Sequence, residues 1–104
     1  MKKEIISSLR NTTLDMPHKC VMKFWSVGCG ACKALEPAIV ELTKEYPDIV
    51  FKSVDSAKSP DDVEKYDVSN LPTLVFLRDG KMADKMAGLK PKSLIVKKIV
   101  EVFG

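Results

Sequence analysis

The chain has 104 residues, of which 30% are charged, and a formal net charge of +3 at pH 7. This length supports one domain with a modest core, and we expect residues 1–104 to form that single domain. Lysines and acidic residues are interleaved along the chain. Because a nucleic-acid-binding face needs clustered basic side chains, the charge pattern argues against nucleic acid as a partner.

The amino terminus carries Lys2 and Lys3 without the roughly 7–15 apolar residues of a secretory signal behind them. No segment approaches the ~20 apolar residues that are needed to cross a bilayer. Together with the initiator Met1, these features predict a cytoplasmic protein that has no membrane partner.

The first elements of the chain are unequally clear. Residues 3–7 fit an edge strand, but the apolar residues from Ile5 toward Leu14 also fit a helix, and both alternatives stay open. Residues 20–26 predict a short buried strand, and Gly28 and Gly30 supply a turn signal behind it.

A helix is predicted from Cys32 because apolar residues recur at helical spacing. Pro37 lies inside this pattern and should kink the helix, since proline lacks the N–H and crowds the preceding turn. Pro47 and Asp48 end it, and residues 49–54 predict the next strand. The apolar positions of this helix are Leu35, Ala38, Ile39, Leu42 and Tyr46.

A short helix follows, with Ser59 as its N-cap and Pro60 at its first position, and it runs to about Tyr66. Residues 73–77 predict a buried strand. Asp79-Gly80 is a strong hairpin signal, and residues 81–87 should return as the antiparallel partner. Pro91 opens a final helix whose predicted apolar face consists of Leu94, Ile95, Ile99, Val102 and Phe103.

This order predicts an α/β domain with a mixed sheet covered by helices on both faces. The early strands are separated by helices and should be parallel, whereas the late hairpin adds an antiparallel pair.

Two thiols, Cys29 and Cys32, are separated by two residues at the start of the predicted helix. Unpaired N–H groups and the helix dipole favour negative charge there, and the thiolate is the attacking species in disulfide exchange. Cys29 is the expected nucleophile because it lies nearer the turn. Cys32, one helical turn on, can attack a mixed disulfide at Cys29 and release the reduced substrate.

Two alternatives stay open from the residues alone. A Cys-x-x-Cys pair can hold zinc, and His18 and Cys20 could complete four ligands. The pair could also be a coincidence of sequence. Cys20, however, lies inside the apolar run of a predicted strand, which favours a small buried side chain over a redox role or a metal ligand.

At these residues the chain resembles the thioredoxin family, from about Cys20 to Phe103. The resemblance implies a four- or five-stranded mixed sheet and dithiol–disulfide exchange through nucleophilic Cys29 and resolving Cys32. It also implies that Pro72 is a cis-proline beside the thiols. The matching motifs are Phe24-Trp25, Cys29-x-x-Cys32-Lys33, Pro37, Leu71-Pro72-Thr73, Asp79-Gly80 and Gly88.

The same resemblance implies the partners of the protein. These are disulfide-containing protein substrates and a thioredoxin-reductase-like electron donor, with no cofactor and no bound metal, and we expect a monomer. A specialised protein with a restricted partner or a different donor is the alternative among enzymes. A binding module without turnover is disfavoured because both thiols are present. The implied substrate-binding residues are Trp25, Gly28, Gly30, Ala31, Leu71, Pro72 and Gly88.

Three residues depart from the family pattern. Gly28 stands where a tryptophan commonly precedes the first cysteine, which should make the loop more mobile. Ala31 replaces the proline between the cysteines and restores an N–H. Lys23 replaces a buried aspartate linked to proton transfer at the resolving cysteine. Lys23 could stabilise a thiolate of the pair by its charge, or be partly neutral because it is buried. The alternative is that its ammonium extends to solvent and has no effect on the thiols.

Overall fold

The structure is a computed structural model, which describes residues 17–104. The strand predicted at residues 3–7 and its helical alternative therefore lie outside the described residues. Within them the elements follow in the order β1 (Lys19–Trp25), α3 (Gly30–Glu45), β2 (Val50–Asp55), α4 (Pro60–Lys65), β3 (Thr73–Arg78), β4 (Lys81–Ala87) and α5 (Lys92–Phe103).

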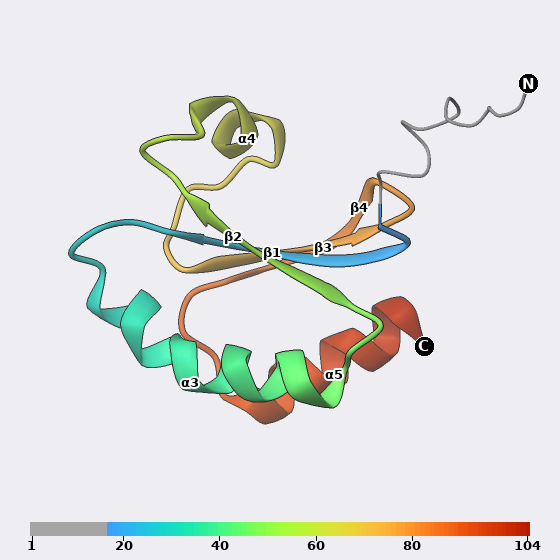
Figure 1. Cartoon of the computed structure of the whole chain (residues 1–104). Helices are drawn as coiled ribbons and strands as arrows, with labels where there is room; N and C mark the ends of the chain where they lie inside the picture. The colour runs from blue at the N-terminus through green and yellow to red at the C-terminus, as the bar shows by residue number, and fades with distance from the viewer. Residues whose placement is uncertain (1–16) are drawn as a thin grey trace, which may run out of the picture.

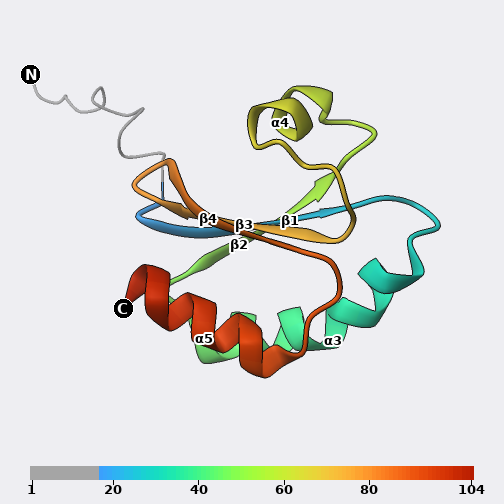
Figure 2. The same ribbon diagram turned by 180° about the vertical axis from the view of Figure 1, so that it is seen from behind.

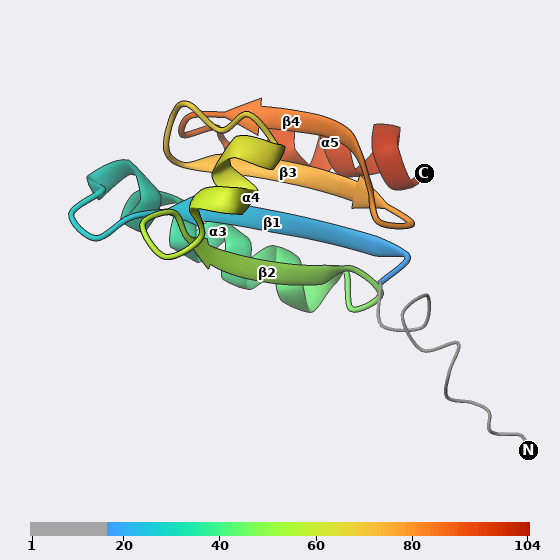
Figure 3. The same cartoon turned by 90° about the horizontal axis from the view of Figure 1, so that it is seen from above.

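The four strands form one mixed sheet in the order β2-β1-β3-β4, as Figure 3 shows from above. β1 pairs with β2 in parallel, whereas β3 is antiparallel to both β1 and β4. Asp79 and Gly80 join β3 to β4 with φ angles of 51° and 82°, the left-handed conformations that a tight hairpin turn needs. The predicted mixed sheet and hairpin are confirmed.

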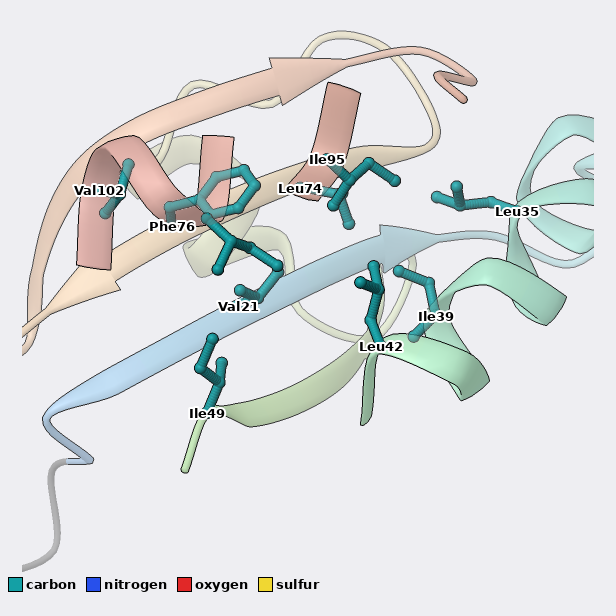
Figure 4. Close-up of a cluster of buried hydrophobic side chains, with 10 residues drawn as sticks. Val21, Leu35, Ile39, Leu42, Ile49, Leu74, Phe76, Ile95 and Val102 are labelled. Atoms are coloured by element: carbon teal, nitrogen blue, oxygen red, sulfur yellow. The ribbon is translucent and has the colours of Figure 1, made fainter. Parts of the chain in front are cut away.

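Helices cover both faces of the sheet. α3 and α5 lie together on one face, and α4 lies on the other (Figures 1 and 2). The core under α3 and α5 is drawn in Figure 4, where side chains from both helices meet those of β1 and β3. Its members are Val21, Leu35, Ile39, Leu42, Ile49, Leu74, Phe76, Ile95, Ile99 and Val102.

Alternation along β1 assigns its side chains to the two faces. Cys20, Met22 and Phe24 belong to the core on the α4 side, whereas Val21 belongs to the core under α3 and α5. Lys23 is two residues after Val21 and therefore lies on the face that α3 and α5 cover. Lys23 thus lies between Val21 and Trp25 on this face, near the carboxyl end of β1.

The N-cap predicted at Ser59 is confirmed, whereas the apolar face predicted for the last helix is wrong at Leu94. Ser59 occupies the N-cap position of α4, but its side chain makes no cap hydrogen bond. Its ψ of 58° lies outside the extended conformation that usually directs an N-cap oxygen at the helix. Leu94 is 43% exposed, because the buried stripe of α5 runs through Ile95 and Ile99 and leaves Leu94 at its edge.

Candidate functional site

Cys29 is the N-cap residue of α3. Its Sγ accepts a hydrogen bond from the Cys32 backbone N–H, with 3.1 Å between nitrogen and sulfur, and its carbonyl accepts the first helical bond from Lys33. The sulfur therefore lies against the unpaired N–H groups and the positive end of the helix dipole, where negative charge is stabilised. This is the environment that the sequence predicted for an activated thiol.

Cys29 and Cys32 form a disulfide whose Cα atoms are 5.3 Å apart, within the usual range for such bonds. Cys29 is partly exposed, whereas Cys32 is only 4% exposed. An external sulfur can therefore reach Cys29 more readily than Cys32. The difference in exposure matches the predicted division into an attacking and a resolving cysteine.

Leu71 and Pro72 lie at the same end of the sheet. The Leu71–Pro72 peptide bond is cis, as the resemblance implied. Phe24 pairs with Thr73 between β1 and β3, so the next residues, Trp25 and Pro72, are neighbours at the edge of the pairing. The Pro72 carbonyl accepts a hydrogen bond of 2.7 Å from the Gly88 N–H. The fold thus brings together the predicted residues of three separate chain segments.

The loop before α3 is open. Gly28 has φ +87°, and a Cβ at this position would meet no atom within 4 Å, while Val27 beside it is 86% exposed. Gly30 and Ala31, the first residues of α3, are also exposed. These residues present backbone and small side chains next to the disulfide, which leaves room for a substrate chain.

Trp25, at the end of β1, is half-buried. Its carbonyl accepts a hydrogen bond from the Ser56 N–H at 2.9 Å. Its indole Nε1 is buried and has no hydrogen-bond partner among the described residues. Trp25 also lines an open groove of about 520 Å³ that reaches Cys32, so it borders the site.

Lys23 is 7% exposed, and its ammonium forms an ion pair and hydrogen bond with Glu36 of α3. The ammonium therefore does not extend alone to solvent, which was one of the two predicted alternatives. Sequence reasoning missed Glu36. Its signal was its position four residues after Cys32, which places both side chains on one face of the helix.

The zinc alternative does not fit the structure. Cys20 is 2% exposed and belongs to the core on the α4 side, where burial raises the pKa of its thiol. His18 pairs instead with Asp79 across the far end of the sheet. Within residues 17–104, no cluster of three or more potential metal ligands occurs.

In the same part of the chain, no helix combines the length and apolar character of a membrane span.

Comparison with known proteins gives one consistent result. The family model described as thioredoxin matches residues 6–101. The chain is 36% identical over 81 residues to a thioredoxin H-type of Picea mariana, covering 78% of this chain and 65% of that protein. It is 38% identical over 79 residues to a thioredoxin of Chlamydia trachomatis, covering 76% of this chain and 78% of that protein.

A solved structure agrees with these relatives. The oxidised form of mitochondrial thioredoxin 3 from Saccharomyces cerevisiae superposes with a TM-score of 0.79 at 32% identity, covering 88% of this chain and 85% of that one. The fold that the two chains share is the four-stranded mixed sheet with its flanking helices.

Proposed function

Because this chain belongs to the thioredoxin family, we propose that Cys29 and Cys32 carry electrons from a thioredoxin-reductase-like donor to disulfides of protein substrates. The chain is a thiol–disulfide oxidoreductase of the thioredoxin type, with a redox-active pair at Cys29 and Cys32. The observation that carries the proposal is the placement of Cys29 as N-cap of α3, disulfide-bonded to a buried Cys32.

The exchange proceeds in two substitutions at sulfur. The Cys29 thiolate attacks one sulfur of the substrate disulfide, forms a mixed disulfide and releases the other substrate sulfur as a thiolate. The Cys32 thiol then loses its proton and attacks the Cys29 sulfur. This step closes the Cys29–Cys32 disulfide and releases the second substrate thiolate. Two electrons pass to the substrate, whose thiolates take up two protons, and the donor later returns two electrons to the pair.

The substrate-binding proposal concerns the open surface around Cys29. An extended substrate chain would lie along Leu71 and Pro72, with Gly88 on the other side, and pair by backbone hydrogen bonds as strand addition does. Gly28, Gly30 and Ala31 offer little side-chain obstruction to such a chain.

We propose that the protein acts as a monomer. We also propose that it acts in the cytoplasm, which fractionation of cells that express the tagged protein would test.

Insulin reduction tests the proposed function. The oxidised protein, a thioredoxin reductase and NADPH should precipitate the insulin B chain, and Cys29→Ser should abolish this activity. Cys32→Ser should instead accumulate a mixed disulfide that mass spectrometry detects. Cys20→Ala is the matched cysteine control and should keep the activity, because Cys20 is buried away from the pair.

The outcomes separate the candidates. If neither the reductase nor dithiothreitol supports turnover, the reductase proposal is wrong. Turnover with dithiothreitol alone would favour the specialised alternative with a different donor, for which the open position at Gly28 is the supporting observation.

A further inference from the structure

We propose that Glu36 exchanges the proton of Cys32 during disulfide exchange, and that Lys23 is the positioning residue that holds the Glu36 carboxylate. The proposal rests on the proposed function, since it concerns the resolving step of the same pair. It is carried by three observations, namely the helical spacing of Cys32 and Glu36, the buried ion pair of Lys23, and the groove that the three side chains share.

The helix brings Glu36 toward Cys32. Residues four apart on a helix have neighbouring side chains, about 5–6 Å between Cβ atoms. Side chains on a helix also lean toward its N-terminus, so the Glu36 side chain leans toward the turn that carries Cys32. A water molecule in the groove that both residues line would bridge the two groups, as bridging waters do between polar side chains.

The strand fixes Glu36 from the other side. Lys23 lies on the face of β1 that α3 covers, and its side chain is only 9% exposed, whereas that of Glu36 is 53% exposed. A buried ammonium needs a partner, because an unpaired buried charge is strongly unfavourable. In the described structure, its ionic partner is Glu36. The ion pair therefore restrains the carboxylate while solvent still reaches it.

The groove connects the three groups. Lys23, Cys32 and Glu36 all line the open groove of about 520 Å³ beside the disulfide. The other charged side chain in its lining is Lys33, and Lys52 lines an adjoining pocket together with Lys23 and Glu36. Among the described residues that line these two spaces, Glu36 is the only carboxylate. The other charged side chains in these linings are lysines, so Glu36 is the side chain there whose chemistry suits it to accept the Cys32 proton.

The proton balance is complete. In the resolving step the Cys32 S–H bond breaks, its proton passes through water to a Glu36 oxygen, and the sulfur lone pair forms the bond to Cys29. The electron pair of the mixed disulfide leaves with the substrate thiolate. Glu36 then returns its proton to solvent through the open groove. In the reverse direction, when a donor thiolate attacks Cys29, protonated Glu36 supplies the proton to the departing Cys32 thiolate.

A pH-jump experiment isolates this step. Reduced protein is mixed with one equivalent of dithiodipyridine at acidic pH, and the release of the second thiopyridone is followed after a jump to higher pH. Cys32→Ser measures the first release alone. We expect Glu36→Gln to slow the second release roughly a hundredfold near neutral pH, at the lower end of general-base effects. Its rate should then rise in proportion to hydroxide, since only solvent can take the proton.

Glu41→Gln is the matched control. Glu41 lies on the same helix and pairs with Lys92 on the surface, so its replacement removes the same charge without changing the groove beside Cys32. Lys23→Met should slow the second release by a smaller factor and keep the wild-type pH profile. Lys23→Asp combined with Glu36→Gln returns a carboxylate to the groove from β1 and should restore that profile.

The results decide between the roles. An unchanged pH profile of the second release in Glu36→Gln would overturn the proposal. A faster second release in that variant would also overturn it, because it would mean that the Lys23 charge acts alone on the Cys32 thiolate. Wild-type protein that releases no second thiopyridone would contradict the proposed function itself. Circular dichroism of each variant confirms that the comparison is made between folded proteins.

Discussion

The ion pair of Lys23 and Glu36 predicts a marked asymmetry in stability between its two partners. Glu36→Ala leaves a buried ammonium without its ionic partner. Lys23→Met removes the buried charge, keeps most of the apolar side-chain length and leaves a half-exposed carboxylate that water can solvate. The two substitutions break the same pair, yet only the first creates an unpaired buried charge.

The exposed fractions of the two side chains determine how large a change in the free energy of unfolding to expect from each substitution. Lys23 is 9% exposed in its side chain and Glu36 is 53% exposed, so water can reach part of the ammonium once the carboxylate is gone. The cost of Glu36→Ala should therefore fall near about 1–3 kcal/mol, the range for an unsatisfied buried polar group. It should stay below the roughly 3–5 kcal/mol of fully buried pairs. Lys23→Met should change the free energy of unfolding by less than about 1 kcal/mol, because a hydrophobic replacement of a buried ion is often neutral.

Urea denaturation of the oxidised proteins measures this difference. With a denaturant slope of about 1–3 kcal/mol per molar for small proteins, Glu36→Ala should lower the midpoint by roughly 1 M, and the double variant should resemble Lys23→Met. Glu41→Ala, which breaks an exposed pair with Lys92, serves as the control and should shift the midpoint far less. Equal losses for Lys23→Met and Glu36→Ala would refute the reasoning.

Three further outcomes follow from single residues. Burial raises the pKa of the Cys20 thiol above its ordinary value of 9.0, so the folded state keeps a proton that the unfolded state loses. Stability should therefore fall as the pH rises past about 9, and Cys20→Ala should lose this alkaline dependence in urea titrations. Gly28→Ala should lower the free energy of unfolding by about 1–2 kcal/mol, because φ is +87° at this residue. An unchanged melting temperature would contradict the positive φ of Gly28. The hydrogen bond from Lys98 lowers the pKa of Asp84 below 3.8. Ionised Asp84 therefore stabilises the folded state above pH 3.8, and this stability should be lost as the pH falls from 3.8 through the lowered pKa. Asp84→Asn should remove this part of the dependence of the free energy of unfolding on acidic pH.

Local signals in the sequence were sufficient for most of the fold. The hairpin followed from Asp79-Gly80, a pair that accepts positive φ angles, and the strand at residues 81–87 followed from it. Alternation and helical spacing act over a few residues, and so they identified the elements and most of the core. The pairing of β1 with β3 could not be read in this way, because it joins segments about fifty residues apart and depends on how the whole sheet is assembled.

The residues of the candidate site also differ in whether local sequence signals could identify them. Cys29, Cys32 and Pro72 belong to motifs whose spacing is visible in the sequence, and the structure places their segments at one end of the sheet. Glu36 carried one local signal, its position four residues after Cys32. Its pairing with Lys23 could not be recognised, because it depends on α3 packing on the face of β1 that carries Lys23. Lys23 itself was noticed only as a departure from a pattern. The sequence left open whether its charge would find a partner, and that partner came from a different element.

The direction of the strands also separates two ends of the molecule. The disulfide and Pro72 lie where β1 ends and β3 begins, whereas the Asp79-Gly80 turn lies at the opposite end, tied to His18 by a 2.9 Å backbone hydrogen bond. α5 also finishes at that opposite end, near Lys19 and Asp48. A fusion partner or an inserted loop could therefore be attached at the turn or after Gly104 without obstructing the thiols. The fold has a reactive end and a separate end for attachment, which suits it to tethering on a surface or within a longer chain.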